Sequence, residues 1–181
     1  NINKCYNSTN KISWSYIVEK EKNRLFKFAT KELSQDAFIA WLMSFAMKEF
    51  EDKDVLLTKC ARDVIKIFYP DMKDDEYVTD IKKQYLNIDI LVKIGDKRVI
   101  IEDKTFTGTH GDQINRYKEA LIKEGVAEEN IICVYYKTGN QARQEPHAIN
   151  IFRPQLLEIF SKYYESVNNV IFKDYVDSLR Y

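Results

Sequence analysis

The fold of this chain is decided by one stretch of its sequence, Asn87-Ile-Asp-Ile-Leu-Val-Lys-Ile-Gly-Asp-Lys-Arg-Val-Ile-Ile-Glu-Asp-Lys104. Two apolar runs flank the dipeptide Gly95-Asp96, which is typical of a two-residue turn between antiparallel strands. Counting outward from that turn along both strands brings Asp89 opposite Glu102. We therefore expect a β-hairpin with two acidic side chains facing each other near its open end.

A third charged side chain belongs to the same face of this hairpin. Side chains alternate between the two faces of a strand, so we expect Lys104 beside Asp89 and Glu102, and Asp103 on the other face. Opposed like charges are destabilising, and a hard divalent cation would turn their repulsion into ligation. An exposed acid pair that Lys104 partly neutralises is the alternative, and it stays open at this point.

These residues resemble the signature of the PD-(D/E)XK nuclease superfamily, in which an acid begins one strand and an acid-x-lysine motif lies on the next. Asp89, Glu102 and Lys104 match that pattern, although Ile88 stands where the superfamily's name has a proline. The run Gln113-Ile-Asn-Arg-Tyr117 is similar to the glutamine-x-x-x-tyrosine motif of the RecB- and Cas4-like exonuclease branch. The resemblance covers roughly residues 30–137.

The resemblance implies a Mg²⁺- or Mn²⁺-dependent hydrolase of phosphodiester bonds. Asp89 and Glu102, with the backbone carbonyl of Asp103, would hold one or two metal ions. Lys104 would orient the attacking water or help to deprotonate it. The implied partner is nucleic acid, with DNA foremost.

Four further residues are candidates for supporting roles in such a site. The superfamily often places an additional acid on the helix before the strands, and Glu32 and Asp36 both qualify. Gln113 and Tyr117 are four residues apart and share one helix face, where the resemblance implies contacts with substrate or lysine. The alternative is that Gln113 only begins the helix and that Tyr117 packs in the core.

The charge balance leaves other functions open. Lys plus Arg and Asp plus Glu number 28 each, so no global positive field attracts nucleic acid and phosphate contacts must be local. A catalytically inactive module of this fold, binding a protein partner or a nucleic-acid end, is therefore the second hypothesis. A nucleotide sensor would need a Gly-rich phosphate loop, which the sequence lacks. The candidate local bases are Lys82, Lys83, Lys93, Lys97, Arg98, Lys104, Arg116 and Lys118.

Periodicity and turn residues predict an α/β fold with a restriction-endonuclease-like core. We expect a mixed four-stranded sheet in the order α-β-β-β-α-β, flanked by helices, with extra helices near both chain ends. Ser34 is the expected N-cap of the first core helix, and Asp112 that of the crossover helix. The predicted helices are 16–28, 34–50, 55–68, 113–124, 154–160 and 169 onward, and the predicted strands are 77–85, 88–94, 97–104 and 131–137.

The length of 181 residues and the 45% hydrophobic content predict a single domain over residues 1–181. The chain has no secretory segment and no apolar run of about 18 residues, so we expect a cytoplasmic protein without a membrane partner. The missing initiator methionine suggests that a flanking region is absent. The oligomeric state stays open, with a homodimer among the alternatives.

Overall fold

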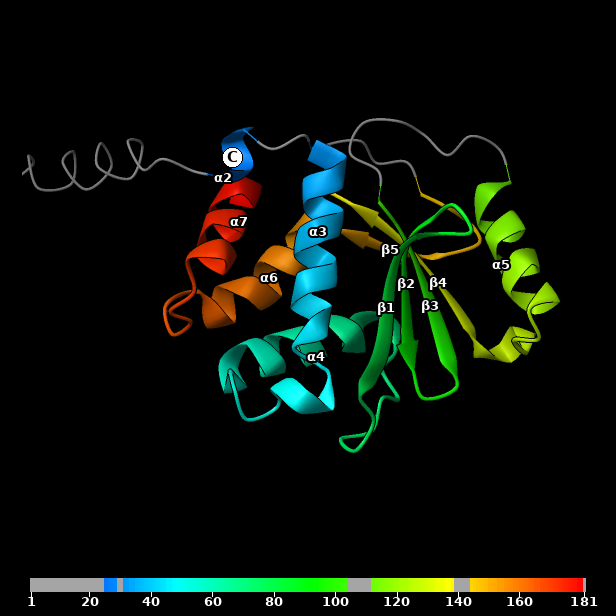
Figure 1. Cartoon of the computed structure of the whole chain (residues 1–181). Coiled ribbons are helices and arrows are strands. Elements are labelled where there is room, and N and C mark those ends of the chain that lie inside the picture. Colours follow the sequence, from blue (N-terminus) through cyan, green and yellow to red (C-terminus); the bar gives the residue numbers. More distant parts are fainter. Residues whose placement is uncertain (1–24, 29–30, 104–111, 139–143, 181) are drawn as a thin grey trace, which may run out of the picture.

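The computed structural model describes residues 25–28, 31–103, 112–138 and 144–180, which form a mixed five-stranded sheet with helices on both faces (Figure 1). The predicted α/β class and the core order α-β-β-β-α-β are confirmed. The strands, in their order across the sheet, are β1 (Val78–Tyr85), β2 (Ile88–Ile94), β3 (Lys97–Asp103), β4 (Ile131–Lys137) and β5 (Ile149–Phe152). The helices are α2 (Leu25–Phe28), α3 (Lys31–Ser44), η1 (Lys48–Phe50), α4 (Val55–Phe68), α5 (Gln113–Lys123), η2 (Glu128–Asn130), α6 (Arg153–Tyr164) and α7 (Val170–Arg180).

Strands β1, β2 and β3 form an antiparallel meander. The pairs between β2 and β3 run from Ile94 with Lys97 at the turn to Ile90 with Ile101, which confirms the register predicted for the hairpin. Gly95 in the turn has a φ of +53°. That left-handed conformation costs little in a residue without a Cβ atom, so Gly95 fixes the turn and with it the register.

The other half of the sheet is parallel. Strand β4 pairs parallel with β3, as a strand that follows a helical crossover can, and β5 pairs parallel with β4. The sheet therefore has five strands, one more than the four that were predicted, and the strand that the prediction missed is β5. Strand β5 has only four residues and lies at the sheet edge, where such a short run gives no clear alternation.

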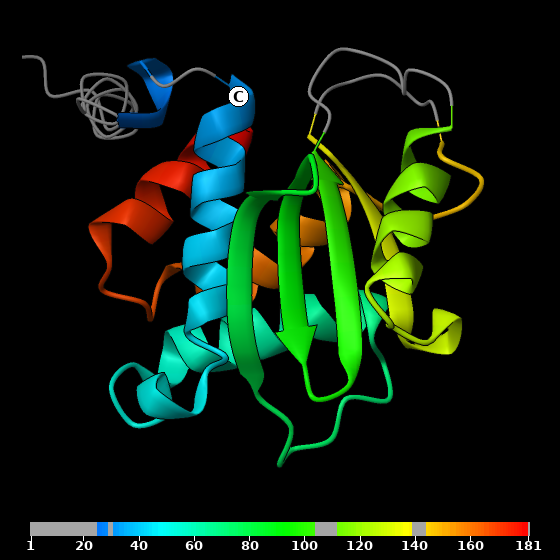
Figure 2. The ribbon, with the colours of Figure 1, turned by 45° about the vertical axis from the view of Figure 1, so that its right-hand side comes forward.

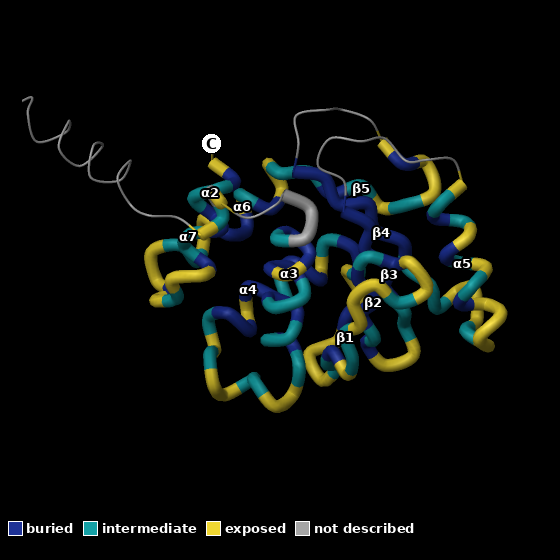
Figure 3. The backbone as a smooth tube through the Cα atoms, turned by 45° about the horizontal axis from the view of Figure 1, so that its top comes forward, coloured by how far each residue is buried: buried dark blue, intermediate teal, exposed yellow. Residues whose placement is uncertain are grey.

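Helices lie on both faces of the sheet (Figure 2), and each face has its own hydrophobic core. Helices α3, α4, α6 and α7 cover one face, whose core includes the stacked rings of Phe38 and Tyr175, with centroids 3.6 Å apart. Helix α5 covers the other face over β3 and β4, where Leu121 packs with Ile100 and Cys133. In the tube view β3 and β4 are mostly buried, whereas the edge strand β1 is largely exposed or half-buried (Figure 3). We call the face covered by α3, α4, α6 and α7 the α3 face of the sheet, and the face covered by α5 the α5 face.

Helix α3 departs from its predicted bounds at both ends. It begins at Lys31, so the prediction of Ser34 as N-cap is wrong, because the good helix formers ahead of Ser34 extend the first turn. It ends at Ser44 and not near Phe50. Beyond the helix, Met47 pairs with Val78 of β1 in an isolated bridge, which requires a non-helical backbone. Tertiary pairing thus overrides an apolar helical pattern.

The remaining predicted helices lie close to their expected positions. Helix α4 has the predicted bounds, because the side chain of Asp54 caps its N-terminus and Pro70 follows its end. Helix α5 ends before Gly125, which has a φ of +89°. Asp112 is not a side-chain cap of α5, since its carboxylate accepts a hydrogen bond from the side chain of Asn115.

The N-terminal helix predicted over residues 16–28 falls largely outside the described residues. Its last part is present as α2, where the backbone N–H of Phe26 donates to Asp174 of α7 at 3.1 Å. Among the helices of the described residues, none combines the length and the apolar content that a bilayer crossing requires.

Candidate metal and nucleic-acid site

The two predicted acids lie on neighbouring central strands, near the same end of the sheet. One step beyond the pair formed by Ile90 and Ile101, the register of β2 and β3 brings Asp89 opposite Glu102. Asp89 is half-buried, whereas Glu102 is fully buried, with 0% of its surface exposed. Strand alternation places Glu102 on the α5 face, because Ile100, two residues earlier, packs in the core beneath α5. The register of β2 and β3 then assigns Asp89, as its opposite residue, to the same face.

The carboxylate of Asp89 is held by two hydrogen bonds. Its Oδ2 atom accepts from the backbone N–H of Asp103 at 3.1 Å, and its Oδ1 atom accepts from the side-chain amide of Gln84 at 3.2 Å. Gln84 has a φ of +52° and precedes a turn whose residues Leu86 and Asn87 also have positive φ. Non-glycine residues with positive φ are strained and tend to occur at functional sites. The turn before Asp89 is therefore a specific local feature that the sequence motifs do not contain.

Asp103 lies on the α3 face of the sheet, as alternation predicts. With its side-chain nitrogen turned towards Asp103, Gln35 of α3 donates to both carboxylate oxygens at 3.1 Å. The same amide group contacts the hydroxyl of Thr138 just after β4. All three side chains are buried. The carboxylate of Asp103 is therefore committed to the α3 face, and only the backbone of this residue is available to a site on the α5 face.

A pair of tyrosines completes the polar cluster on the α3 face. The hydroxyl groups of Tyr136 and Tyr175 share a hydrogen bond. Burial raises the pKa of Tyr136 well above its ordinary value, and the nearby Tyr175, Asp103 and Asp36 raise that pKa further. Asp36, one candidate for the additional helix acid, is thus buried beside Asp103 and not on the face of Glu102.

Helix α5 presents Gln113 and Tyr117 from above the α5 face. The side-chain amide of Gln113 donates to the hydroxyl of Tyr117, which confirms that the two residues share one face of the helix. The ring of Tyr117 is buried with Ile114 and Leu121, so packing in the core is also correct for this residue. Gln113 is only half-buried and remains the better placed of the two for contact with a ligand.

Two predicted site residues cannot be placed with these groups. Lys104 lies outside the described residues. Glu32 lies in the first turn of α3, but its side chain is outside the described part of the chain.

The donor set on the α5 face fits a hard divalent cation. Magnesium binds through one or two carboxylates and keeps several waters or substrate oxygens in its remaining positions, which Asp89 and Glu102 can accommodate. Within the described residues, no three or more His, Cys, Asp or Glu side chains are grouped closely enough to enclose a metal by themselves.

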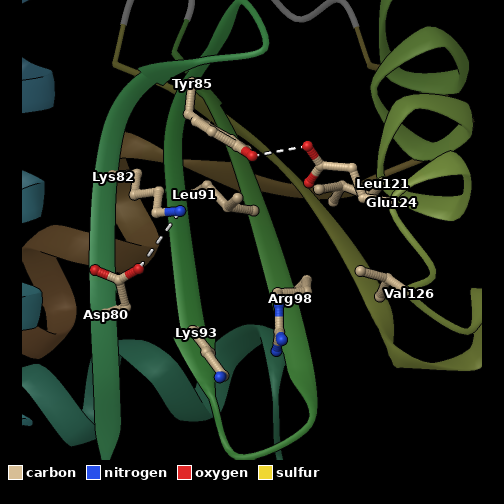
Figure 4. A pocket seen from close by; sticks show the side chains of 9 residues that line it. All are labelled: Asp80, Lys82, Tyr85, Leu91, Lys93, Arg98, Leu121, Glu124 and Val126. Atoms are coloured by element: carbon tan, nitrogen blue, oxygen red, sulfur yellow. Dashed lines mark hydrogen bonds and ion pairs between the residues drawn. The ribbon is translucent and has the colours of Figure 1, made fainter.

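A groove runs along the α5 face from the same end of the sheet towards the hairpin turn (Figure 4). It has a volume of about 240 Å³ and lies between β1, β2 and β3 on one side and α5 on the other. Lys82, Lys93 and Arg98 line it from the three strands, and Tyr85 contributes an aromatic ring. Lys82 pairs with Asp80 at 3.9 Å, and its ammonium lies over the ring of Tyr85, 4.3 Å from the ring centroid.

Comparison with known proteins agrees with the superfamily resemblance and with the α/β fold. A sequence model of the PD-(D/E)XK nuclease superfamily matches residues 23–172, so the chain belongs to this superfamily. No protein of curated function and no solved structure matches the chain significantly.

The structure also reveals polar residues that the sequence motifs did not single out. Gln84 and Gln35 hold Asp89 and Asp103 from opposite faces of the sheet. Lys137, at the end of β4, is fully buried. The only sequence signal for Lys137 is a charged residue that continues the apolar run Ile131-Ile-Cys-Val-Tyr-Tyr136.

Proposed function

We propose that this chain is a metal-dependent nuclease that hydrolyses phosphodiester bonds in DNA. The proposal is supported by the register of β2 and β3, which, continued by one step, brings Asp89 opposite Glu102 at the end of two central strands. Two carboxylates in this arrangement repel each other, and burial of Glu102 strengthens that repulsion. A bound cation would relieve it, and divalent metal use is typical of the superfamily to which the chain belongs.

Each residue of the site has a defined part in this proposal. Asp89 and Glu102, with the backbone carbonyl of Asp103, would hold Mg²⁺ or Mn²⁺. The metal would supply an activated water and would stabilise the charge that develops on the phosphate. Lys104 would orient that water or take part in its deprotonation.

Supporting groups would keep these ligands in position. The hydrogen bonds from Asp103 and Gln84 fix the orientation of the Asp89 carboxylate before any metal arrives. Gln113 would direct its amide towards the substrate, with its own orientation set by the hydroxyl of Tyr117. Glu32 remains the candidate for the additional helix acid, since Asp36 lies on the other face of the sheet.

The groove on the α5 face supports nucleic acid as the substrate class. Its cations Lys82, Lys93 and Arg98 would neutralise backbone phosphates. Because the formal net charge of the chain is zero, this local cluster would have to supply the attraction that a global field does not.

Incubation with nucleic-acid substrates tests the proposal directly. Supercoiled plasmid, linear duplex, single-stranded DNA and RNA would each be incubated with Mg²⁺, Mn²⁺ or EDTA. We expect metal-dependent cleavage of DNA that EDTA abolishes. Glu102→Gln should abolish cleavage, whereas Glu119→Gln, an equivalent change at an exposed position of α5, should not.

The zero net charge favours a second candidate, a catalytically inactive module that binds a nucleic-acid end or a protein partner. Binding of DNA by the wild-type protein without cleavage under any metal condition would select this candidate. Neither cleavage nor binding would leave a protein partner as the remaining hypothesis.

A further inference from the structure

Lys137 is an unusual residue in this fold. It is the last residue of β4 and has 0% of its surface exposed. Its Nζ atom is buried, and it has no hydrogen-bond partner or ion-pair partner among the described residues. Lysine is almost never fully buried without a partner, because the ammonium loses its hydration. The protein therefore retains a costly group at this position.

The position of Lys137 relates it to the acids of the proposed site. In the parallel pairing of β3 and β4, Glu102 lies beside Tyr135. Side chains two residues apart in a strand share a face, so Lys137 belongs to the same face as Tyr135 and Cys133. Cys133 packs in the core under α5. Lys137 thus lies on the α5 face, one strand across from Glu102 and two residues further towards the end of the sheet.

We propose that Lys137 is a phosphate-binding residue of the active site, an assignment that rests on the proposed nuclease function. The carboxylates of Asp89 and Glu102 attract a cation, and the site then needs a donor for the phosphate oxygens that the cation does not neutralise. An ammonium group has three donors and no acceptor, so it suits a non-bridging phosphate oxygen. In a setting from which water is excluded, that interaction is much stronger than at an exposed lysine.

If Lys137 binds phosphate, its replacement by an apolar side chain should raise the stability of the free protein and lower its activity. An unpaired buried ammonium that awaits a ligand destabilises the free protein, and an apolar side chain of similar volume would remove that cost. A structural ammonium would behave in the reverse way, because its removal would leave its partners unsatisfied. Lys137→Met therefore separates the two roles by the sign of its effect on the melting temperature.

The experiment compares wild type, Lys137→Met and Lys59→Met, the last being a matched change at an exposed position of α4 on the other side of the sheet. Three quantities are measured: the melting temperature in EDTA, the rate of Mg²⁺-dependent DNA cleavage, and the binding of a 5′-phosphorylated oligonucleotide in Ca²⁺ by fluorescence anisotropy. For Lys137→Met we expect a melting temperature about 2–4 °C higher, cleavage about 100-fold slower and clearly weaker oligonucleotide binding. Lys59→Met should match the wild type in all three.

A second variant covers the case in which Lys137→Met does not fold. Lys137→Ala leaves a space that a small primary amine can enter, so added propylamine should restore cleavage and binding in a concentration-dependent way. Lack of rescue in a folded Lys137→Ala protein, or a lower melting temperature with unchanged binding in Lys137→Met, would overturn the assignment.

The outcomes for Lys137 and for the nuclease function remain distinguishable. If the wild type binds the oligonucleotide but cleaves nothing, the nuclease proposal fails and the comparison of binding alone decides the role of Lys137. If wild type and Lys137→Met cleave DNA at the same rate and bind the oligonucleotide with the same affinity, the nuclease proposal stands and the proposed role of Lys137 is wrong. If the wild type neither binds nor cleaves, both are wrong.

Discussion

The side chain of Asp89 accepts a hydrogen bond from the backbone N–H of Asp103 at 3.1 Å, and so ties the start of β2 to the end of β3. The paired residues of the β2–β3 ladder end one residue before this point, at Ile90 and Ile101. The side-chain carboxylate of Asp89 thus extends the β2–β3 ladder, in which the other hydrogen bonds join backbone groups. Asp89 therefore has a structural role in the free protein in addition to its proposed role as a metal ligand.

These two roles of Asp89 can be separated by substitution. Asp89→Asn keeps an oxygen that can accept from Asp103 but removes one of two opposed charges, so it should melt at or above the wild-type temperature in EDTA. Asp89→Ala also removes the acceptor and should lose about 1.5–3 kcal/mol of unfolding free energy. Both variants should lose the stabilisation that saturating Mg²⁺ gives the wild type. Thermal unfolding by circular dichroism, with EDTA and with Mg²⁺, measures all of these.

The opposite pattern for Asp89→Asn would contradict this view. If the variant melts clearly lower in EDTA and still gains the full Mg²⁺ shift, then Asp89 is purely structural and the metal lies elsewhere.

Glu102 is the second proposed metal ligand. Its role can be tested with an isosteric substitution. Glu102→Gln keeps the volume of a fully buried side chain, so it creates no cavity. We expect Mg²⁺ binding, measured by isothermal titration calorimetry, to weaken at least about tenfold, because the site loses half of its carboxylate charge. Glu119→Gln is the control, since Glu119 is exposed on α5. Equal Mg²⁺ affinity of Glu102→Gln and wild type would remove Glu102 from the site.

The sheet and its register could be predicted because the decisive signals are local. The turn at Gly95-Asp96 and the alternation on either side of it fix which residues face each other, and the structure has that register. The end of helix α4 could be predicted because residues that precede a proline, here Pro70, avoid helical geometry. Short-range chemistry is sufficient in these two places.

Other features depend on distant contacts that no local pattern reports. Helix α3 ends at Ser44, three residues before Met47 pairs with Val78, a residue of β1 that lies far along the chain. The side chains that hold the site were missed for the same reason. Gln35 reaches Asp103 only through the packing of α3 on the sheet, and a lone charged residue such as Lys137 looks like a surface position until the strand is placed inside the fold.

The tyrosine pair on the α3 face predicts how stability depends on pH. Burial first, then Tyr175 and the acids Asp103 and Asp36, hold the pKa of Tyr136 well above its ordinary value of about 10. The unfolded chain therefore ionises this phenol first. The stabilisation is complete below pH of about 10 and is lost as the pH rises towards the folded-state pKa, by up to about 1.4 kcal/mol per pH unit for one group.

Urea unfolding between pH 8 and pH 11 measures this dependence. Tyr136→Phe should be less stable than wild type at pH 8, by about 1 kcal/mol, because Tyr175 loses its hydrogen-bond partner. Its stability should then fall less steeply above pH 10. The fall should not vanish, since burial also raises the pKa of Tyr175 and raises that of Cys133 to about 11. A steeper fall in Tyr136→Phe than in wild type would contradict the assignment.

The groove on the α5 face predicts how DNA binding depends on salt. Lys82 and Lys93 project from neighbouring strands into this groove, as Figure 4 shows. If both neutralise phosphates, Lys82→Glu combined with Lys93→Glu should weaken DNA binding in Ca²⁺. It should also reduce the slope of log affinity against log salt by about 1.4–1.8, because each phosphate contact contributes about 0.7–0.9. Fluorescence anisotropy across a salt series measures both quantities.

A matched pair of charge reversals decides whether position or net charge is responsible. Lys59→Glu combined with Lys162→Glu makes the same change in net charge at exposed positions of α4 and α6, on the other side of the sheet. Long-range attraction depends on total charge, so both double variants would lose affinity equally if the field of the whole protein drew DNA in. Contacts in the groove depend on position, so only the pair at Lys82 and Lys93 would lose affinity and salt dependence together. Equal losses would therefore remove the groove as the path of the DNA backbone while leaving the metal site at Asp89 and Glu102 untouched.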